Sequence, residues 1–214
     1  NAEPAQPDSV LSADPDLTKR SVIMNAKNNT RSDGYTYVGD EVGYIIEIRN
    51  DSAPESAWLD VISRTDIPVG LDIVPGSIKL TTAAGETIDV PDSAYDAKSR
   101  TLAFYVGDIP GSKQVTVSFK AIVTLEALNQ DIGMKSFAYG VLPSEFDAAD
   151  ENYVKPEPGE AFVPAEGWIL YDLAHKRVES EVKVYPSEKT TEYNHVLPDT
   201  QQEADQAAKL AKTG

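Results

Sequence analysis

Cysteine is absent from the 214 residues, which excludes disulfides, thiol catalysis and zinc–thiolate sites. No run of eighteen apolar residues occurs either, so we expect no segment of this chain to span a bilayer. Basic residues are few: 19 Lys and Arg stand against 35 Asp and Glu, for a net charge of −16. Such a surface repels nucleic-acid phosphates and anionic membranes. We therefore expect neither partner, and a core or some other crosslink in place of disulfides.

Catalytic motifs are missing as well. The sequence has no Gly-rich phosphate loop, HExxH or GxSxG motif, and His175 and His195 have no ligand at metal spacing beside them. We therefore predict that the protein is not an enzyme and holds no cofactor. One alternative is Ca²⁺ bound by the acidic cluster of Asp147, Asp150 and Glu151, although this cluster lacks the ligand spacing of an EF-hand loop.

The sequence does contain short segments in which apolar and polar residues alternate, between about residues 17 and 142. In the segment 115–123 every second residue is apolar, and the same holds for 42–48. A period of two indicates strands that are covered on one face. Further strands are predicted at 17–24, 58–65, 77–81, 101–106 and 134–141.

Turn residues separate these segments at intervals of roughly ten residues. They are Gly39-Asp40, Pro68-Val69-Gly70, Pro75-Gly76, Gly85 and Pro110-Gly111. Many short strands without a helical period favour an all-β fold, an antiparallel β-sandwich. Trp58 and Trp168 are candidates for a glycan-binding or protein-binding patch, but a Trp in a strand more often belongs to the core.

The chain divides into three parts on composition. Residues 1–16 are rich in Pro, Ala and Asp and form a linker or processed leader. Residues 17–186 form the sandwich, with 143–186 supplying an acidic, proline-containing connector and two final strands at 168–173 and 178–185. Residues 187–214 form a polar spacer, in which 201–212 has good helix formers but little apolar surface. Both terminal parts are expected to be flexible.

Several of these segments resemble a known family when their order and spacing are taken together. The run VGDEVGYIIEIRNDS at 38–52 has the Val-Gly-Asp, alternating strand and closing Asn of a conserved bacterial surface-repeat domain of unknown function. Similar elements follow in the same order: Asp66-Ile67-Pro68-Val69-Gly70-Leu71, Ser77-Ile78, Tyr95-Asp96, Leu102-Ala103-Phe104, and Gly107-Asp108-Ile109 before the strand at 115. The resemblance covers 17–142 and extends to the related isopeptide-forming fimbrial domains.

This resemblance implies an immunoglobulin-like sandwich that serves as a stalk module or adhesin in wall-anchored proteins and pili. Many fimbrial relatives join a Lys of the first strand to an Asn of the last, with a buried acid assisting. The chemistry needs a neutral amine in an apolar site and a protonated carboxyl. By resemblance, Lys19 or Lys27 is the nucleophile and Asp66 the acid.

The Asn of that pattern is not matched. Ser136 stands where the resemblance expects it, and Asn129 and Asn152 are available nearby but off the pattern. The alternative is that Lys19 and Lys27 are solvated and that Asp66 caps a turn.

The last five residues, Leu210-Ala211-Lys212-Thr213-Gly214, resemble a sortase signal. Sortases recognise Leu-Pro-x-Thr-Gly, cleave after Thr and pass the acyl group to an amine. The present run has Ala at the Pro position, which resembles the Leu-Ala-x-Thr-Gly signal of a sortase class in high-GC Gram-positive bacteria. A hydrophobic span and a basic tail are expected to follow such a signal.

Two weaker motifs precede it. Leu197-Pro198-Asp199-Thr200-Gln201 has the Pro of a sortase signal but not the Gly, and is interpreted as linker. Val182-Lys183-Val184-Tyr185-Pro186 resembles the Val-Tyr-Pro-Lys motif of pilins, whose Lys is the nucleophile in polymerisation. Ser187 occupies that Lys position, and Lys183 and Lys189 are the nearest amines. The alternative is an ordinary edge strand that ends at Pro186.

Together these observations predict a non-enzymatic, extracellular surface protein of a Gram-positive bacterium, an adhesin or a pilin or stalk subunit anchored to the cell wall at Thr213. Its partners would be a sortase and either peptidoglycan or a neighbouring pilin, together with a host or surface ligand of unknown nature. The alternative is a carbohydrate-binding or scaffold module of a larger exported enzyme.

Overall fold

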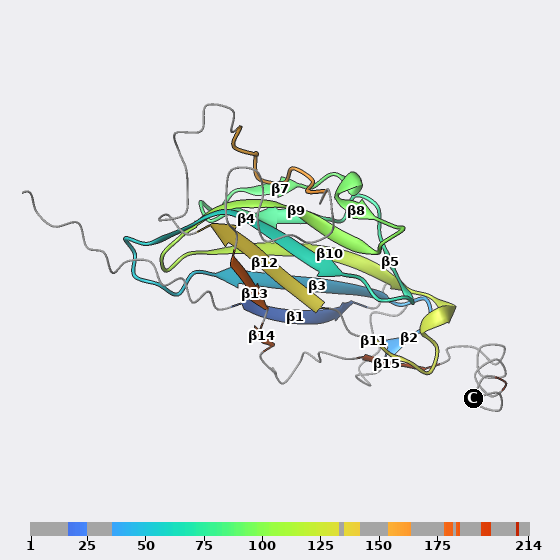
Figure 1. Cartoon of the computed structure of the whole chain (residues 1–214). Helices are drawn as coiled ribbons and strands as arrows, with labels where there is room; N and C mark the ends of the chain where they lie inside the picture. The colour runs from blue at the N-terminus through green and yellow to red at the C-terminus, as the bar shows by residue number, and fades with distance from the viewer. Residues whose placement is uncertain are drawn as a thin grey trace, which may run out of the picture.

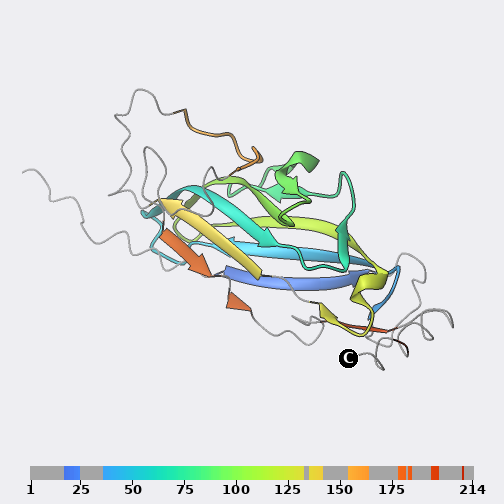
Figure 2. The same ribbon diagram turned by 45° about the vertical axis from the view of Figure 1, so that its right-hand side comes forward.

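The computed structural model describes residues 17–24, 36–132, 135–141, 154–163, 178–181, 183–184, 194–197 and 209. Two large sheets pack face to face in it (Figures 1 and 2). Their strands are antiparallel to their neighbours except where β14 meets β1. The predicted all-β antiparallel sandwich is confirmed.

The first large sheet has seven strands, with β3 and β10 at its centre. In spatial order they are β14 (Lys183–Val184), β1 (Leu17–Met24), β3 (Glu41–Arg49), β10 (Gln114–Val123), β6 (Lys79–Thr81) and β7 (Thr87–Asp89), while β5 (Leu71–Ile73) also pairs with β10. β5 and β6 pair with different parts of the same edge of β10, so residues 74–78 between them form an arch beside this edge.

The second large sheet has five strands, in the order β13 (Val178–Glu181), β12 (Lys135–Val141), β4 (Ala57–Asp66), β9 (Thr101–Pro110) and β8 (Tyr95–Asp96). A small third sheet joins β11 (Asp131–Ile132), β15 (Asn194–Leu197) and β2 (Thr36–Tyr37). The two short 3-10 helices are η1 (Asp92–Ala94) and η2 (Leu125–Ala127).

The core lies between the two large sheets and follows the alternation of the sequence. In β10 the apolar residues at 115, 117, 119, 121 and 123 are all buried, whereas the residues between them are exposed or partly exposed. β3 has the same pattern, with its core positions at 42, 44, 46 and 48. The two-residue period therefore predicted both the strands and the faces that they bury.

Trp58 belongs to this core, since it is 1% exposed. Gly140 on the neighbouring β12 makes room for its indole: a Cβ at Gly140 would lie 2.0 Å from the indole nitrogen. The suggestion that Trp58 contributes to a surface binding patch is therefore wrong, because a side chain enclosed in this way cannot meet a ligand. Trp168 lies outside the described residues.

The end of the chain departs from the predicted spacer at four residues. Asn194–Leu197 forms β15, which lies between β11 and β2, and Val196 is fully buried in the core. The prediction of a polar spacer is wrong for this stretch, because one buried valine and backbone pairing on both sides are enough to hold it. Residues 1–16 and the predicted strand at 168–173 lie outside the described residues.

The strand predicted at 178–185 is divided between the two large sheets. β13 pairs with β12, while β14 pairs with β1 in parallel. The connector, predicted as irregular, also contacts a sheet: the peptide N–H of Tyr105 donates to Glu160 (2.9 Å), and that of Phe162 to Ala103 (3.1 Å). Residues 154–163 thus cover part of the edge of β9 that β8 leaves open.

Candidate functional site

Lys19, one of the two predicted nucleophiles of the crosslink, lies on β1. Its backbone pairs with that of Ile46, whose side chain is fully buried. Ser136 on β12, where the resemblance expects Asn, is 3% exposed, and its hydroxyl lies 3.3 Å from that of Thr65. An interior position thus carries a hydroxyl and offers no side-chain amide. Lys27 and Asn152 lie outside the described residues.

Asp66, the predicted assisting acid, is the last residue of β4 and does not lie in a turn. Its two carboxylate oxygens accept hydrogen bonds from the Arg64 guanidinium at 3.0 and 3.1 Å. Its side chain is 37% exposed. The crosslinking chemistry needs a protonated carboxyl in an apolar site, whereas Asp66 is partly solvated and paired with a cation.

Asn129 also lies away from the core. It follows η2, has a left-handed φ of 60° and is exposed. Its peptide N–H donates to the carbonyl of Val196 at 3.0 Å, so its backbone helps to hold β15. An exposed amide lacks the apolar environment that the reaction requires, and the crosslink itself stays a prediction.

Lys183 of the pilin-like motif lies on β14, the outermost strand of the seven-stranded sheet, where its backbone pairs with Thr18. This is the edge position that the alternative interpretation expects for a strand ending at Pro186. Tyr185, Pro186 and Lys189 lie outside the described residues, so polymerisation through this motif stays a prediction.

The five residues of the sortase-like motif, 210–214, also lie outside the described residues. The last described strand before them, β15, ends at Leu197, whose carbonyl accepts from the N–H of Val38 at 3.3 Å. The intervening residues 198–209 reach about 40 Å when fully extended. The second near-match begins at Leu197, and its first residue is thus part of β15.

Asn50 has a role that the sequence did not reveal, although it was recognised as the end of a strand. It is fully buried, and its amide donates to the Ile109 carbonyl at 2.9 Å while accepting from the Ser52 N–H at 3.0 Å. Backbone bonds also join Asn50 to Lys113 and Ser112. One amide side chain therefore closes this end of the sandwich, by joining the end of β3 to β9.

Arg100 is the second such residue. Its guanidinium donates to the carbonyls of Ile67 (3.1 Å), Pro68 (2.9 Å) and Leu71. The turn after β4, which carries the Asp-x-x-Pro-x-Gly-Leu resemblance, is thus stabilised by a side chain about thirty residues later. Only the fold brings the two segments together.

A third group joins the connector to the sandwich. Lys155 Nζ lies 2.6 Å from Asp108 Oδ2 and 4.0 Å from Asp60 Oδ1. Asp60 is 2% exposed, has a left-handed φ of 47° at an irregularity of β4, and donates its N–H to Asp108 Oδ1 at 2.9 Å. This ion-pair group binds the connector to the β4–β9 pair.

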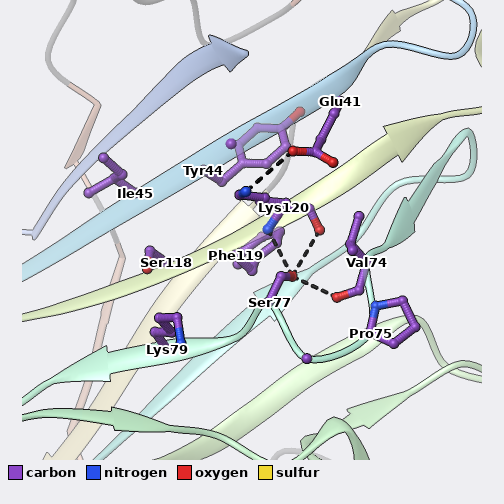
Figure 3. A pocket seen from close by; sticks show the side chains of 12 residues that line it. Glu41, Tyr44, Ile45, Val74, Pro75, Ser77, Lys79, Ser118, Phe119 and Lys120 are labelled. Atoms are coloured by element: carbon purple, nitrogen blue, oxygen red, sulfur yellow. Dashed lines mark hydrogen bonds and ion pairs between the residues drawn. The ribbon is translucent and has the colours of Figure 1, made fainter. Parts of the chain in front are cut away.

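A hollow of about 490 Å³ lies on the outer face of the seven-stranded sheet. Its floor crosses β3 and β10, where the small residues Gly43 and Ser118 occupy diagonal positions of the ladder. The arch 74–77 forms one wall, because Ser77 fixes it to β10: the Lys120 N–H donates to Ser77 Oγ at 3.1 Å (Figure 3).

Side chains of both charges line this hollow. Lys120 Nζ lies 3.4 Å from Glu41 Oε1, and Lys79 Nζ lies 2.5 Å from Asp89 Oδ1. Ile45, Val74 and Pro75 add apolar surface (Figure 3). The hollow therefore combines two ammonium groups, a carboxylate and two serine hydroxyls with aliphatic walls.

No metal centre is found among the residues that the structure describes: none of their His, Asp and Glu side chains form a group of three or more. Asp147, Asp150, Glu151 and His175 lie outside the described residues, so Ca²⁺ at the acidic cluster stays a prediction. His195 lies on β15, where its backbone pairs with Asp131. The described residues contain no helix that is long and apolar enough to cross a bilayer.

Comparison with known proteins gives structural similarities alone. No family model and no curated protein sequence matches the chain. Among solved structures, it is similar to BcpA, the major pilin subunit of Bacillus cereus, with 11% identity and a TM-score of 0.48 over 86% of this chain and 40% of that one.

Two other pilins give comparable values. The backbone pilin of serotype M6 Streptococcus pyogenes has 14% identity and a TM-score of 0.41 over 80% of this chain and 36% of that one. A C-terminal fragment of the major pilin GBS80 of Streptococcus agalactiae has 10% identity and a TM-score of 0.43 over 86% and 56%. The chain thus spans about two fifths of the length of BcpA. At these identities no residue role can be transferred.

Proposed function

We propose that this chain is an exported, non-enzymatic surface module that a sortase attaches to the Gram-positive cell wall through Thr213. The observation that carries the proposal is the run Leu210-Ala211-Lys212-Thr213-Gly214 at the end of a polar stretch. β15 is the last described strand before the motif, and residues 198–209 lie between it and Leu210. A reach of about 40 Å beyond Leu197 would let an enzyme take up the motif without disturbing the core.

The proposed reaction is a transpeptidation. The sortase nucleophile attacks the Thr213 carbonyl and the Thr213–Gly214 amide breaks. The Gly214 nitrogen takes up a proton and leaves as an amine. An amine of peptidoglycan or of a neighbouring pilin then displaces the enzyme and forms a new amide with Thr213. This chain supplies only the acyl donor and needs no catalytic group of its own.

The body suits a stalk because of how its first strand is placed. All eight residues of β1 pair with β3, and β14 pairs on the other side of β1. A pull along the chain would load this ladder in shear, so that many hydrogen bonds must break together. This supports a load-carrying role without requiring the Lys–Asn crosslink.

The test is a reaction of the chain with a sortase that reads Leu-Ala-x-Thr-Gly and with a triglycine probe. We expect intact mass to show the probe joined to Thr213, and the Thr213→Ala variant to stay unmodified. The control is Thr200→Ala in the near-match, which should react like the parent. An unreactive parent chain would reject anchoring at Thr213 and would favour a binding module of a larger exported enzyme.

A further inference from the structure

The hollow on the outer face of the seven-stranded sheet is lined by residues within 41–120 and does not include the sortase-like motif. It lies on strands of the body, and its volume of about 490 Å³ is within the usual range of roughly 300–1,000 Å³ for small-molecule sites. Two of its floor positions carry the small residues Gly43 and Ser118.

Among the described residues that line the hollow, two lysines stand against one carboxylate. The chain carries a net charge of −16, yet the charged residues that line the hollow are Lys79, Lys120 and Glu41. Lys79 is paired with Asp89, whose side chain is 82% exposed. Pairs this exposed contribute little to stability, so the Lys79 ammonium can turn to a bound anion at little cost.

The remaining polar groups set a second requirement. The Glu41 carboxylate is only 21% exposed and accepts from Lys120 at 3.4 Å. Because an ionised carboxylate only accepts hydrogen bonds, a ligand group beside it must donate. The half-buried Ser118 hydroxyl, able both to donate and to accept, lies on the strand between Glu41 and Lys79. A suitable ligand therefore has an anion at one end and hydroxyl donors at the other.

The walls of the hollow require a ligand with apolar surface. Val74 and Pro75 on the arch and Ile45 on β3 present aliphatic surface (Figure 3). A pyranose ring has C–H surface of this kind together with its hydroxyl groups. We propose that the hollow binds an acidic monosaccharide unit, with its carboxylate at Lys79, its hydroxyls at Glu41, Lys120 and Ser118, and its ring against Val74 and Pro75.

The experiment is an NMR titration of the ¹⁵N-labelled full chain with D-glucuronate. D-glucose serves as the neutral analogue and N-acetyl-L-glutamate as an acidic ligand without a sugar ring. We expect saturable shifts of the amides of Gly43, Ser118 and Lys120 with glucuronate, and at least tenfold weaker binding of both other probes. Lys79→Gln should weaken glucuronate binding about tenfold, whereas Lys113→Gln, at an exposed lysine outside the hollow, should leave it unchanged.

Each other outcome overturns the proposal. Absence of saturable shifts at these three amides removes the site. Equal binding of glucose would show that the site does not recognise the carboxylate. Equal binding of N-acetyl-L-glutamate would show that it does not recognise the sugar ring. An unaffected Lys79→Gln variant places the carboxylate elsewhere. Because Lys79 is exposed, this variant is expected to fold, and an unchanged amide spectrum would verify it.

Discussion

The body, which comprises β1 and residues 36–141, and the segments that follow it are held by different kinds of contact. In the body, apolar side chains from two sheets meet in one core. The later segments attach mostly through backbone pairing, at the edge of β9 and beside β1, β12, β11 and β2. Among the side chains described after residue 141, Val196 is the buried hydrophobic one. The body should therefore set the global stability, whereas the later segments should open locally at lower cost.

The largest expected effect distinguishes two glycines, one in each region. Gly140→Ala should lower the free energy of unfolding by about 3 kcal/mol, because the new Cβ would collide with the Trp58 indole at 2.0 Å. Gly159→Ala in the connector should cost about 1–2 kcal/mol, because its φ is +91° and the nearest atom is the flexible end of Ile88 at 3.1 Å. Urea unfolding of both variants measures the difference. Equal losses would contradict the division into body and attached segments.

Asn50→Ala should cost about 2 kcal/mol, because it leaves the Ile109 carbonyl and the Ser52 N–H without their buried partner. The matched control is Asn129→Gly, at an exposed asparagine whose φ of 60° suits glycine; it should change stability by less than about 0.5 kcal/mol. Thermal unfolding compares the two. A tolerated Asn50→Ala would show that this end of the sandwich does not depend on the amide.

Val196→Ala should cost about 1.5 kcal/mol, for the loss of two buried methyl groups. If β15 opens locally, most of this loss should be seen as faster hydrogen exchange in β15, β2 and β11, and less as a lower midpoint of global unfolding. Exchange mass spectrometry locates the change. Faster exchange throughout β3 and β10 would show instead that β15 belongs to the body's cooperative unit.

Tyr44→Phe should stabilise the body by about 1 kcal/mol, because the Tyr44 hydroxyl is buried and has no hydrogen-bond partner among the described residues. Burial also raises the pKa of this phenol above its ordinary value of 10.0. The unfolded state therefore loses the proton first as pH rises above about 10, and stability should fall there. The variant should lose less stability than the parent between pH 9 and 11, and an identical pH profile would argue against the buried, unpaired phenol.

The smallest effect concerns the tether of the connector. Lys155→Ala should cost about 0.5 kcal/mol, since the lysine is 52% exposed although it lies 2.6 Å from Asp108. Lys79→Ala removes a more exposed pair and should cost less. A double-mutant cycle of Lys155 with Asp108 measures the coupling, and a value near zero would show that backbone pairing alone holds the connector.

Sequence patterns predicted the body well because its strands bury alternate residues over long stretches. The strand at 115–123 could be recognised for this reason, and so could the turns that bound it. β15 could not be, since four residues with one buried side chain produce no periodicity.

The candidate sites were harder to predict, because they depend on strand register. Ser136 was identified as a departure from the family pattern, and the structure adds that it is buried against Thr65. The hollow required knowledge that Gly43 and Ser118 stand diagonally on neighbouring strands. The Lys155–Asp108 pair joins positions 47 residues apart, which no local pattern reveals.

The most direct test of the proposed function is made on the cell wall of the producing bacterium. Wall digested with a muramidase should release a peptide of this chain that ends at Thr213 and is joined through an amide to a peptidoglycan or pilin amine, as seen by tandem mass spectrometry. Thr213→Ala should abolish that peptide and move the protein to the membrane or the medium. Recovery of the protein without any linkage at Thr213, or linkage through another residue, would contradict the account.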